Sequence, residues 1–183
     1  MRRFWSFCCV FVLVVFQGCD KGESGVDYRR EMRQFVMEIS RAAKEKKTNF
    51  VVIPQNGMEL VCVSDDAAGE LAGGYLAAID GHGQEDLWFG YDGDNRVTPS
   101  GESERLCRYL DRSKGSGNVV LVTDYCQGEK NVGISRKLNG ERGYLSFQAP
   151  SRELDVIPAG TPYGENSDNI EVLGDGHLMI AKV

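Results

Sequence analysis

The pattern of hydrophobic and polar residues predicts an amphipathic helix in the N-terminal third of the chain. Asp27 is a favourable residue for capping a helix N-terminus. Lys44, Lys46 and Lys47 suit a C-terminus, where the helix dipole favours cations. Between these ends, apolar residues recur at helical spacing, at Met32, Phe35, Val36, Ile39 and Ala43. The sequence therefore predicts a helix over residues 27–47 with one apolar face.

Four short runs further along the chain are typical of β-strands, at residues 50–54, 75–80, 119–123 and 143–148. Helices are expected between them, over residues 58–76, 98–114 and 129–138, the first of them broken by glycines. Strands that alternate with helices form parallel βαβ units, so we predict an α/β fold, either a Rossmann-like sheet or a TIM barrel. The sequence lacks GxGxxG after its first strand and GxxxxGK followed by Ser or Thr anywhere, so nothing supports a nucleotide site.

Residues 1–18 have the pattern of a bacterial lipoprotein signal peptide. Arg2 and Arg3 precede an apolar run over residues 4–16, which is shorter than the roughly twenty residues that span a bilayer. Gly18 directly precedes Cys19, as in a lipoprotein cleavage box, so we expect Cys19 to carry the acyl chains, such as palmitate, and residues 19–26 to be a tether. An ordinary secretory signal peptide and a retained membrane anchor are the alternatives. The preferred interpretation places a domain over residues 27–183 at the cell membrane or envelope, facing outside the cytoplasm.

The chain is acidic, with a formal net charge of −6. Binding to nucleic acid requires clustered Lys and Arg, so an acidic chain argues against that class of partner. The same charge disfavours electrostatic adhesion to anionic lipid, and membrane attachment is therefore expected through the lipid anchor alone.

The cysteines and histidines give no sign of a metal or cofactor site. Beyond Cys19, the cysteines are Cys62, Cys107 and Cys126, whose spacing fits neither a zinc site nor a redox CxxC motif. We expect buried thiols, with one Cys62–Cys107 disulfide as the alternative. His82 and His177 lie far apart in the sequence, and a loop or surface position is expected for each. No cofactor is predicted.

Polar residues collect where the predicted strands end. In parallel α/β folds ligands bind at the carboxyl ends of strands. The residues at or near these ends are Gln55, Asn56, Asp80, Glu85, Asp86, Trp88, Asp124, Tyr125 and Gln148. Carboxylates among aromatic rings suit a sugar site, because the rings stack on sugar faces and paired carboxylates supply acid and base. The alternative is that these residues are polar because strand ends lead into turns.

Several strings of residues also resemble a known family. They include NFVVIPQNG at 49–57, IDGHGQEDLWFGYDGDN at 79–95 and VLVTDYC at 120–126, with further matches at 28–36, 142–147, 152–154 and 161–163. In this order they resemble a bacterial TIM-barrel family related to glycoside hydrolase family 114, the endo-α-1,4-polygalactosaminidase-like proteins. The resemblance implies a partial (β/α) barrel that acts on amino-sugar polysaccharide. It implies Glu85 as general acid, with Asp80 as second candidate, and a cleft formed by Gln55, Asn56, Trp88, Asp124, Tyr125 and Gln148.

The resemblance covers the second half of a barrel of about eight βα units. The aspartate that the family places on an earlier strand has no counterpart, since Asp27 is expected to cap a helix. Because a glycosidase needs two carboxylates, hydrolysis is an open question. Three outcomes are considered: two copies that pair into a whole barrel, a non-enzymatic module that binds glycan or an envelope protein, and a degenerate remnant.

Overall fold

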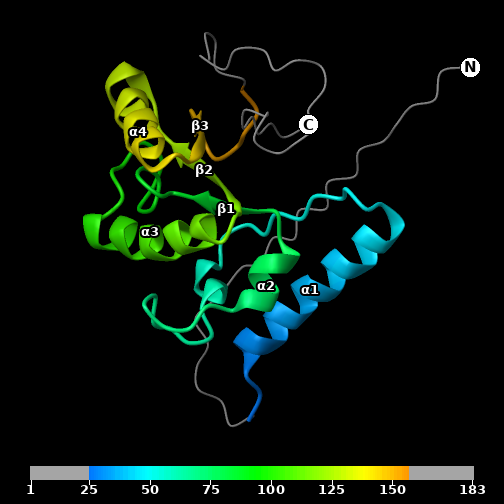
Figure 1. Cartoon of the computed structure of the whole chain (residues 1–183). Coiled ribbons are helices and arrows are strands. Elements are labelled where there is room, and N and C mark those ends of the chain that lie inside the picture. The colour runs from blue at the N-terminus through cyan, green and yellow to red at the C-terminus, as the bar shows by residue number, and fades with distance from the viewer. Residues whose placement is uncertain (1–24, 157–183) are drawn as a thin grey trace, which may run out of the picture.

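Helix α1 (Tyr28–Lys46) begins and ends as its sequence predicts. In this computed structural model, which describes residues 25–156, the Asp27 carboxylate accepts a hydrogen bond from the Arg30 backbone N–H at 3.0 Å. The apolar face of α1 packs on the core through Met32, Val36 and Met37. Phe35, which the spacing assigned to that face, is 48% exposed, because α1 lies at one side of the molecule and packs mainly against α2 (Gly73–Ala78) (Figure 1).

The centre of the fold is a parallel sheet of three strands in the order β1-β2-β3. Its strands are β1 (Gly81–Glu85), β2 (Val119–Tyr125) and β3 (Leu145–Ala149). Helix α3 (Ser100–Gly115) connects β1 to β2, and α4 (Gly128–Arg142) connects β2 to β3 (Figure 1). These two βαβ units confirm the predicted α/β class.

The described helices cover one face of this sheet. Val120 and Val122 of β2 pack with Leu106 and Leu110 of α3 in a core that α1, α2 and the 3-10 helix η1 (Met58–Val61) complete. Successive side chains of a strand point to opposite faces. Glu85, Thr123 and Phe147 are register partners on neighbouring strands, so they share the face that points away from α3 and α4.

The segment expected as the first strand runs beside β1 but forms only a single bridge, between Gln55 and Gly83. Three backbone hydrogen bonds join it to β1 and the residue before it. Asp80 N–H donates to the Val52 carbonyl at 2.9 Å. At the bridge, Gly83 N–H donates to the Pro54 carbonyl and Asn56 N–H to the Gly83 carbonyl, both at 2.8 Å. A regular ladder is interrupted because Pro54 has no N–H and the Val52 N–H donates to the Asp80 carboxylate at 2.8 Å.

The prediction of a strand over residues 75–80 is wrong. Tyr75 and Leu76 are buried residues of α2, and the strand begins at Gly81. The strand β1 reads GHGQE, which contains no hydrophobic residue, so its position in the sheet comes from its neighbours and not from a local pattern. The helical stretch expected over residues 58–76 is broken, as predicted, into η1 and the start of α2.

The cysteines of the described part are free and buried, at Cys62, Cys107 and Cys126. This confirms the prediction of thiols over the alternative Cys62–Cys107 disulfide. Burial raises the pKa of the Cys126 thiol to about 12, so it remains protonated at neutral pH. Within residues 25–156 no helix has the length and apolar character needed to cross a membrane. The predicted signal peptide, Cys19 and His177 lie outside the described residues.

Candidate functional site

The carboxyl ends of β1 and β2 bring Glu85 and Tyr125 together on the face of the sheet that points away from α3 and α4. The Tyr125 hydroxyl donates a hydrogen bond to Glu85 Oε1 at 2.9 Å. Tyr125 is only 3% exposed, whereas Glu85 is partly exposed. Burial, together with the neighbouring Glu85 charge, raises the pKa of Tyr125, so the phenol is a protonated donor at neutral pH.

The loop after residue 54 fixes the position of Glu85. The side-chain oxygen of Asn56 accepts a hydrogen bond from the Glu85 backbone N–H at 3.1 Å. Asn56 has a φ of 58°, a left-handed conformation that Asn tolerates better than most residues. The Gln55 side chain lies over Gly83, where a β-carbon would collide with its oxygen, so any larger residue at this position of β1 would require Gln55 to move.

Arg152 lies across the same edge of the sheet, in the segment that follows β3. Its guanidinium donates to both carboxylate oxygens of Asp86, at 3.0 and 3.2 Å, and its Nε is 2.9 Å from Asp94 Oδ1. The guanidinium also lies over the Tyr125 ring, 4.5 Å from its centroid. Burial raises the pKa of Asp86, and the hydrogen bonds from Arg152 oppose that shift. Two aspartates at this edge are therefore paired with a cation.

Glu85 differs from these two aspartates in its partner. Its carboxylate accepts from a neutral phenol, and within residues 25–156 no Lys, Arg or His forms an ion pair with it. Glu85 is thus the carboxylate at this edge whose charge is not offset by a cation. That arrangement suits a group that must exchange a proton with a ligand.

Asp80, the second candidate acid, does not lie at this edge. It precedes β1, and Glu85 is the last residue of that strand, so the two carboxylates are at opposite ends. Asp80 accepts from the Val52 N–H at 2.8 Å and pairs with Lys44 Nζ at 2.9 Å. The expected position of Asp80 after a strand is wrong, because the strand starts directly beyond it.

Asp124 is close in sequence to Tyr125 but points to the opposite face of the sheet. Its side chain is fully buried and accepts four hydrogen bonds. The donors are Trp88 N–H at 2.8 Å, Phe89 N–H at 3.2 Å, Ser135 Oγ at 2.6 Å and Asn139 Nδ2 at 3.1 Å. Burial raises the pKa of Asp124, and these donors act against that shift. The structure assigns Asp124 to joining the loop after β1 to helix α4, and not to contact with a ligand.

Gln148 and Trp88 also lie on the helix side. Gln148 is buried and donates to Ser135 Oγ at 3.1 Å. The Trp88 indole N–H donates to Asn139 Oδ1 at 3.0 Å, and the Arg142 guanidinium lies over its ring. Both side chains therefore contact α4, on the face of the sheet opposite Glu85, so the structure does not bring them together with Glu85 and Tyr125.

His82 is fully buried in β1, contrary to the prediction of a loop or surface position. Its Nε2 lies 3.3 Å from the Asn56 carbonyl, and because a carbonyl only accepts, Nε2 carries the hydrogen. Burial lowers the pKa of His82 to about 4. In the described part of the chain, no three His, Cys, Asp or Glu side chains gather as a metal would require.

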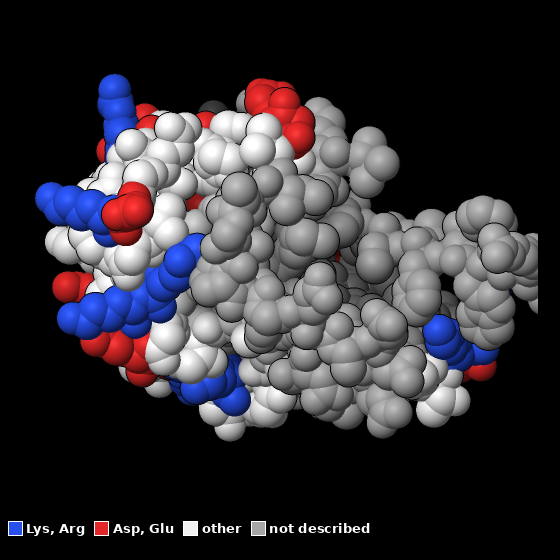
Figure 2. Space-filling model, turned by 90° about the horizontal axis from the view of Figure 1, so that it is seen from above, with Lys and Arg blue, Asp and Glu red and all other residues white. Residues whose placement is uncertain are grey.

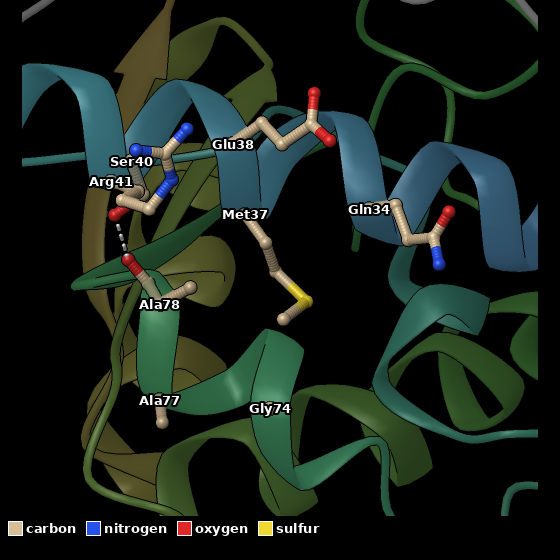
Figure 3. A pocket seen from close by; sticks show the side chains of 8 residues that line it. All are labelled: Gln34, Met37, Glu38, Ser40, Arg41, Gly74, Ala77 and Ala78. Atoms are coloured by element: carbon tan, nitrogen blue, oxygen red, sulfur yellow. Dashed lines mark hydrogen bonds between the residues drawn. The ribbon is translucent and has the colours of Figure 1, made fainter.

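A groove lies between α1 and α2, away from the Glu85 edge. Figure 3 shows Met37 and Arg41 of α1 above Gly74 and Ala77 of α2. Two of its polar groups are engaged, since Ser40 Oγ donates to the Ala78 carbonyl at 2.5 Å and Arg41 pairs with Glu45 at 2.8 Å. Gln34 and Glu38 also line the groove. None of the site residues expected from the sequence lies in it, so the Glu85 edge remains the candidate site.

Charge is distributed without a patch of one sign in the view of Figure 2. There, Lys and Arg side chains alternate with Asp and Glu side chains over the described surface. The part of the described surface that this view shows therefore carries no broad field of one sign.

No protein-family model and no solved structure matches this chain. The chain is 36% identical to an uncharacterized protein of Methanocaldococcus jannaschii over 164 residues, which are 83% of this chain and 45% of that protein. It is 32% identical to an uncharacterized protein of Thermotoga maritima over 146 residues, which are 76% of this chain and 37% of that protein. The chain thus spans less than half the length of either relative.

Proposed function

We propose that this chain is a lipid-anchored envelope protein whose domain is part of a (β/α) barrel, related to glycoside hydrolases that act on amino-sugar polysaccharide. Glu85 is the general acid of this proposal, and Gln55, Asn56 and Tyr125 surround it. The observation that carries the proposal is the 2.9 Å hydrogen bond from Tyr125 to Glu85 at the carboxyl ends of adjacent parallel strands. Catalytic residues of (β/α) barrels come from those strand ends.

The arrangement of helices supports a barrel over a doubly wound sheet. In a barrel all helices lie outside the strands, whereas a doubly wound sheet carries helices on both faces. Within residues 25–156, α3 and α4 both cover the face that holds Val120, Val122 and Asp124. The strands also follow one another in chain order, as they do in a barrel. The opposite face, with Glu85 and Tyr125, would then line the barrel interior.

Whether a second carboxylate is available beside Glu85 distinguishes a hydrolase from a module that only binds. Acid catalysis would use Glu85 to protonate the leaving oxygen, and a second carboxylate would act as base or nucleophile. Asp86 and Asp94 are the other two carboxylates described above at this edge, but both are bound to Arg152. This pairing favours a second proposal, a non-enzymatic module that binds glycan at the Glu85 edge. Hydrolysis requires a second carboxylate from elsewhere, either a further part of the protein or a second copy that completes the barrel.

The lipid anchor in this proposal rests on the sequence pattern of residues 1–19. Cleavage before Cys19 would leave a short polar tether ahead of the Asp27 cap of α1. The domain would then lie close to the membrane, on the side outside the cytoplasm, where envelope polysaccharide is accessible. Metabolic labelling with an acyl-chain precursor, comparing the full chain with its Cys19→Ser variant, tests this part separately.

The test of function compares the full chain with its Glu85→Gln and Glu104→Gln variants. Chitosan and N-acetylated chitin oligosaccharides serve as amino-sugar probes, and both binding and release of reducing ends are measured. A hydrolase should lose its activity in Glu85→Gln and keep its binding within a few-fold, whereas the exposed Glu104 should be neutral. Hydrolysis that persists in Glu85→Gln contradicts the acid assignment. Binding without hydrolysis supports the binding module, and the absence of both rejects the proposed function.

A further inference from the structure

We propose that Arg152 is a positioning residue that holds the Tyr125 hydroxyl on Glu85 and so fixes the orientation of the candidate acid. This inference rests on the proposed function, because it takes Glu85 as the reacting group. It gives a role to the short segment at 152–154, which follows β3 and contains none of the candidate catalytic residues.

Arg152 connects the ends of all three strands. It follows β3, binds Asp86 directly after β1, and lies over the ring of Tyr125 at the end of β2. Its guanidinium also donates to the Gly90 carbonyl, and its Nε reaches Asp94 at 2.9 Å. A planar guanidinium with five donors can bind two carboxylates and stack on a ring at once, which a lysine ammonium cannot do.

The backbone around Arg152 is itself held in place. Its own N–H donates to Asp94 Oδ2 at 3.1 Å. Just upstream, Gln127 Nε2 donates to the Pro150 carbonyl at 2.6 Å, and Cys126 N–H donates to the Ala149 carbonyl at 2.9 Å. These hydrogen bonds fix the backbone from which the Arg152 side chain extends. The position of the guanidinium over Tyr125 therefore depends on the backbone as well as on the contacts of the side chain.

The stacked guanidinium restricts how the Tyr125 ring can move. A phenol has one hydrogen to donate, and here it is directed to Glu85 Oε1. If the ring shifts, that hydrogen leaves the carboxylate, and Glu85 loses the hydrogen bond that orients it. With the ring held, Oε1 is engaged, and Oε2 of Glu85 has no hydrogen-bond partner among residues 25–156. Oε2 is thus the oxygen left to meet a ligand.

Arg152 also changes the charge that surrounds Glu85. Asp86 is adjacent in sequence, and the Glu85 charge contributes to the raised pKa of Asp86, although burial is the larger cause. By pairing with both aspartates, Arg152 offsets the like charges nearest to Glu85. A change at Arg152 therefore acts on Glu85 in two ways, through the position of the phenol and through the local charge.

The experiment measures the Tyr125 hydroxyl directly in the full chain. The protein is labelled with 13C at the ζ-carbon of tyrosine and examined by NMR in equal parts H2O and D2O. A hydroxyl that exchanges slowly gives two carbon lines, because deuterium shifts the attached carbon, and Tyr125→Phe identifies the resonance. We expect two lines for the wild-type protein and one line for Arg152→Gln, as hydroxyl exchange becomes roughly tenfold faster when the cation–π contact is lost.

Two further variants separate positioning from general loosening. Arg152→Lys keeps the positive charge but lacks the planar guanidinium that stacks on the Tyr125 ring. It should also give a single carbon line for Tyr125. Arg136→Gln removes an arginine that binds Gln148 on the other face of the sheet, and it should keep two lines. Cooperative thermal melts verify that each variant is folded. Two lines in either Arg152 variant, or a single line in the wild-type protein, would overturn the proposal.

The outcome is independent of whether an amino-sugar polymer is cleaved. If no polymer is bound or hydrolysed while the Tyr125 lines respond to Arg152 as expected, the proposed function fails and the positioning contact stands. If a Glu85→Leu variant, which lacks any acceptor for the phenol, keeps two lines, Glu85 is not the partner that slows the hydroxyl, and the positioning of Glu85 by Arg152 is rejected even where hydrolysis is observed.

Discussion

Ser135 Oγ donates a 2.6 Å hydrogen bond to Asp124 Oδ2, and this contact joins helix α4 to the helix-covered face of the sheet. Two backbone N–H groups of the loop after β1 reach the other oxygen of the same carboxylate. Asp124 therefore links three segments that are distant in sequence. This role explains why a carboxylate lies in a fully buried position without contacting a ligand.

Replacing Asp124 with alanine should destabilise the protein strongly. The change leaves buried donors of the loop and of α4 without an acceptor, which costs roughly 3 kcal/mol or more of unfolding free energy. Urea denaturation at pH 7 measures this loss. The matched change Asp92→Ala, at an exposed position, should alter stability by less than about 0.5 kcal/mol. An Asp124→Ala variant as stable as Asp92→Ala contradicts the assigned role.

His82 should make the protein less stable in acid. Its pKa is about 4 in the folded protein and near 6.5 in the unfolded chain, so between these pH values only the unfolded state takes up a proton. The unfolding free energy should therefore fall as the pH is lowered from 6.5 to 4, by on the order of 3 kcal/mol. The measurement is urea denaturation across this range for the wild-type protein and for His82→Gln.

The difference in unfolding free energy between the two proteins gives the contribution of His82 alone, because the carboxylates that titrate near pH 4 are common to both. The wild-type protein should lose stability relative to His82→Gln as the pH falls. Parallel curves for the two proteins would show that His82 is not buried in its neutral form.

Gly83→Ala tests the packing of Gln55 over β1. A β-carbon at residue 83 meets the oxygen of the Gln55 side chain, so the single substitution should cost about 1 kcal/mol. Because the obstacle is the end of a flexible side chain, the additional change Gln55→Ala should relieve most of that cost. A thermal-melt double-mutant cycle measures the coupling. Additive effects of the two substitutions would place Gln55 elsewhere.

Much of the fold follows from local sequence patterns. The Asp27 cap and the apolar spacing define α1, and the apolar run 119–123 identifies β2, which the structure extends to Tyr125. The strand β1 could not be found in this way, since GHGQE has neither apolar residues nor alternation. Its burial comes from tertiary contacts, which a local pattern does not contain.

The candidate site was predicted only in part, because some of its contacts also depend on tertiary structure. The rule that ligands meet strand ends selected Glu85 and Tyr125, and the structure brings these two together. The same rule selected Asp124, although consecutive residues of a strand point to opposite faces, so Tyr125 and Asp124 cannot share a cleft. Arg152 was not predicted as part of the site, because Asp86 and Arg152 are 66 residues apart and no local motif connects them.

The most direct test of the central claim is to map where an amino-sugar oligosaccharide binds. A chitosan hexamer is titrated into the isotope-labelled full chain, and amide chemical shifts are followed by NMR. We expect the largest changes at Gln55, Glu85 and Tyr125, with little change at Asp80 or Gln148. Changes centred on Gln34 and Ala77, in the groove between α1 and α2, or no saturable change at all, would contradict a glycan site at Glu85.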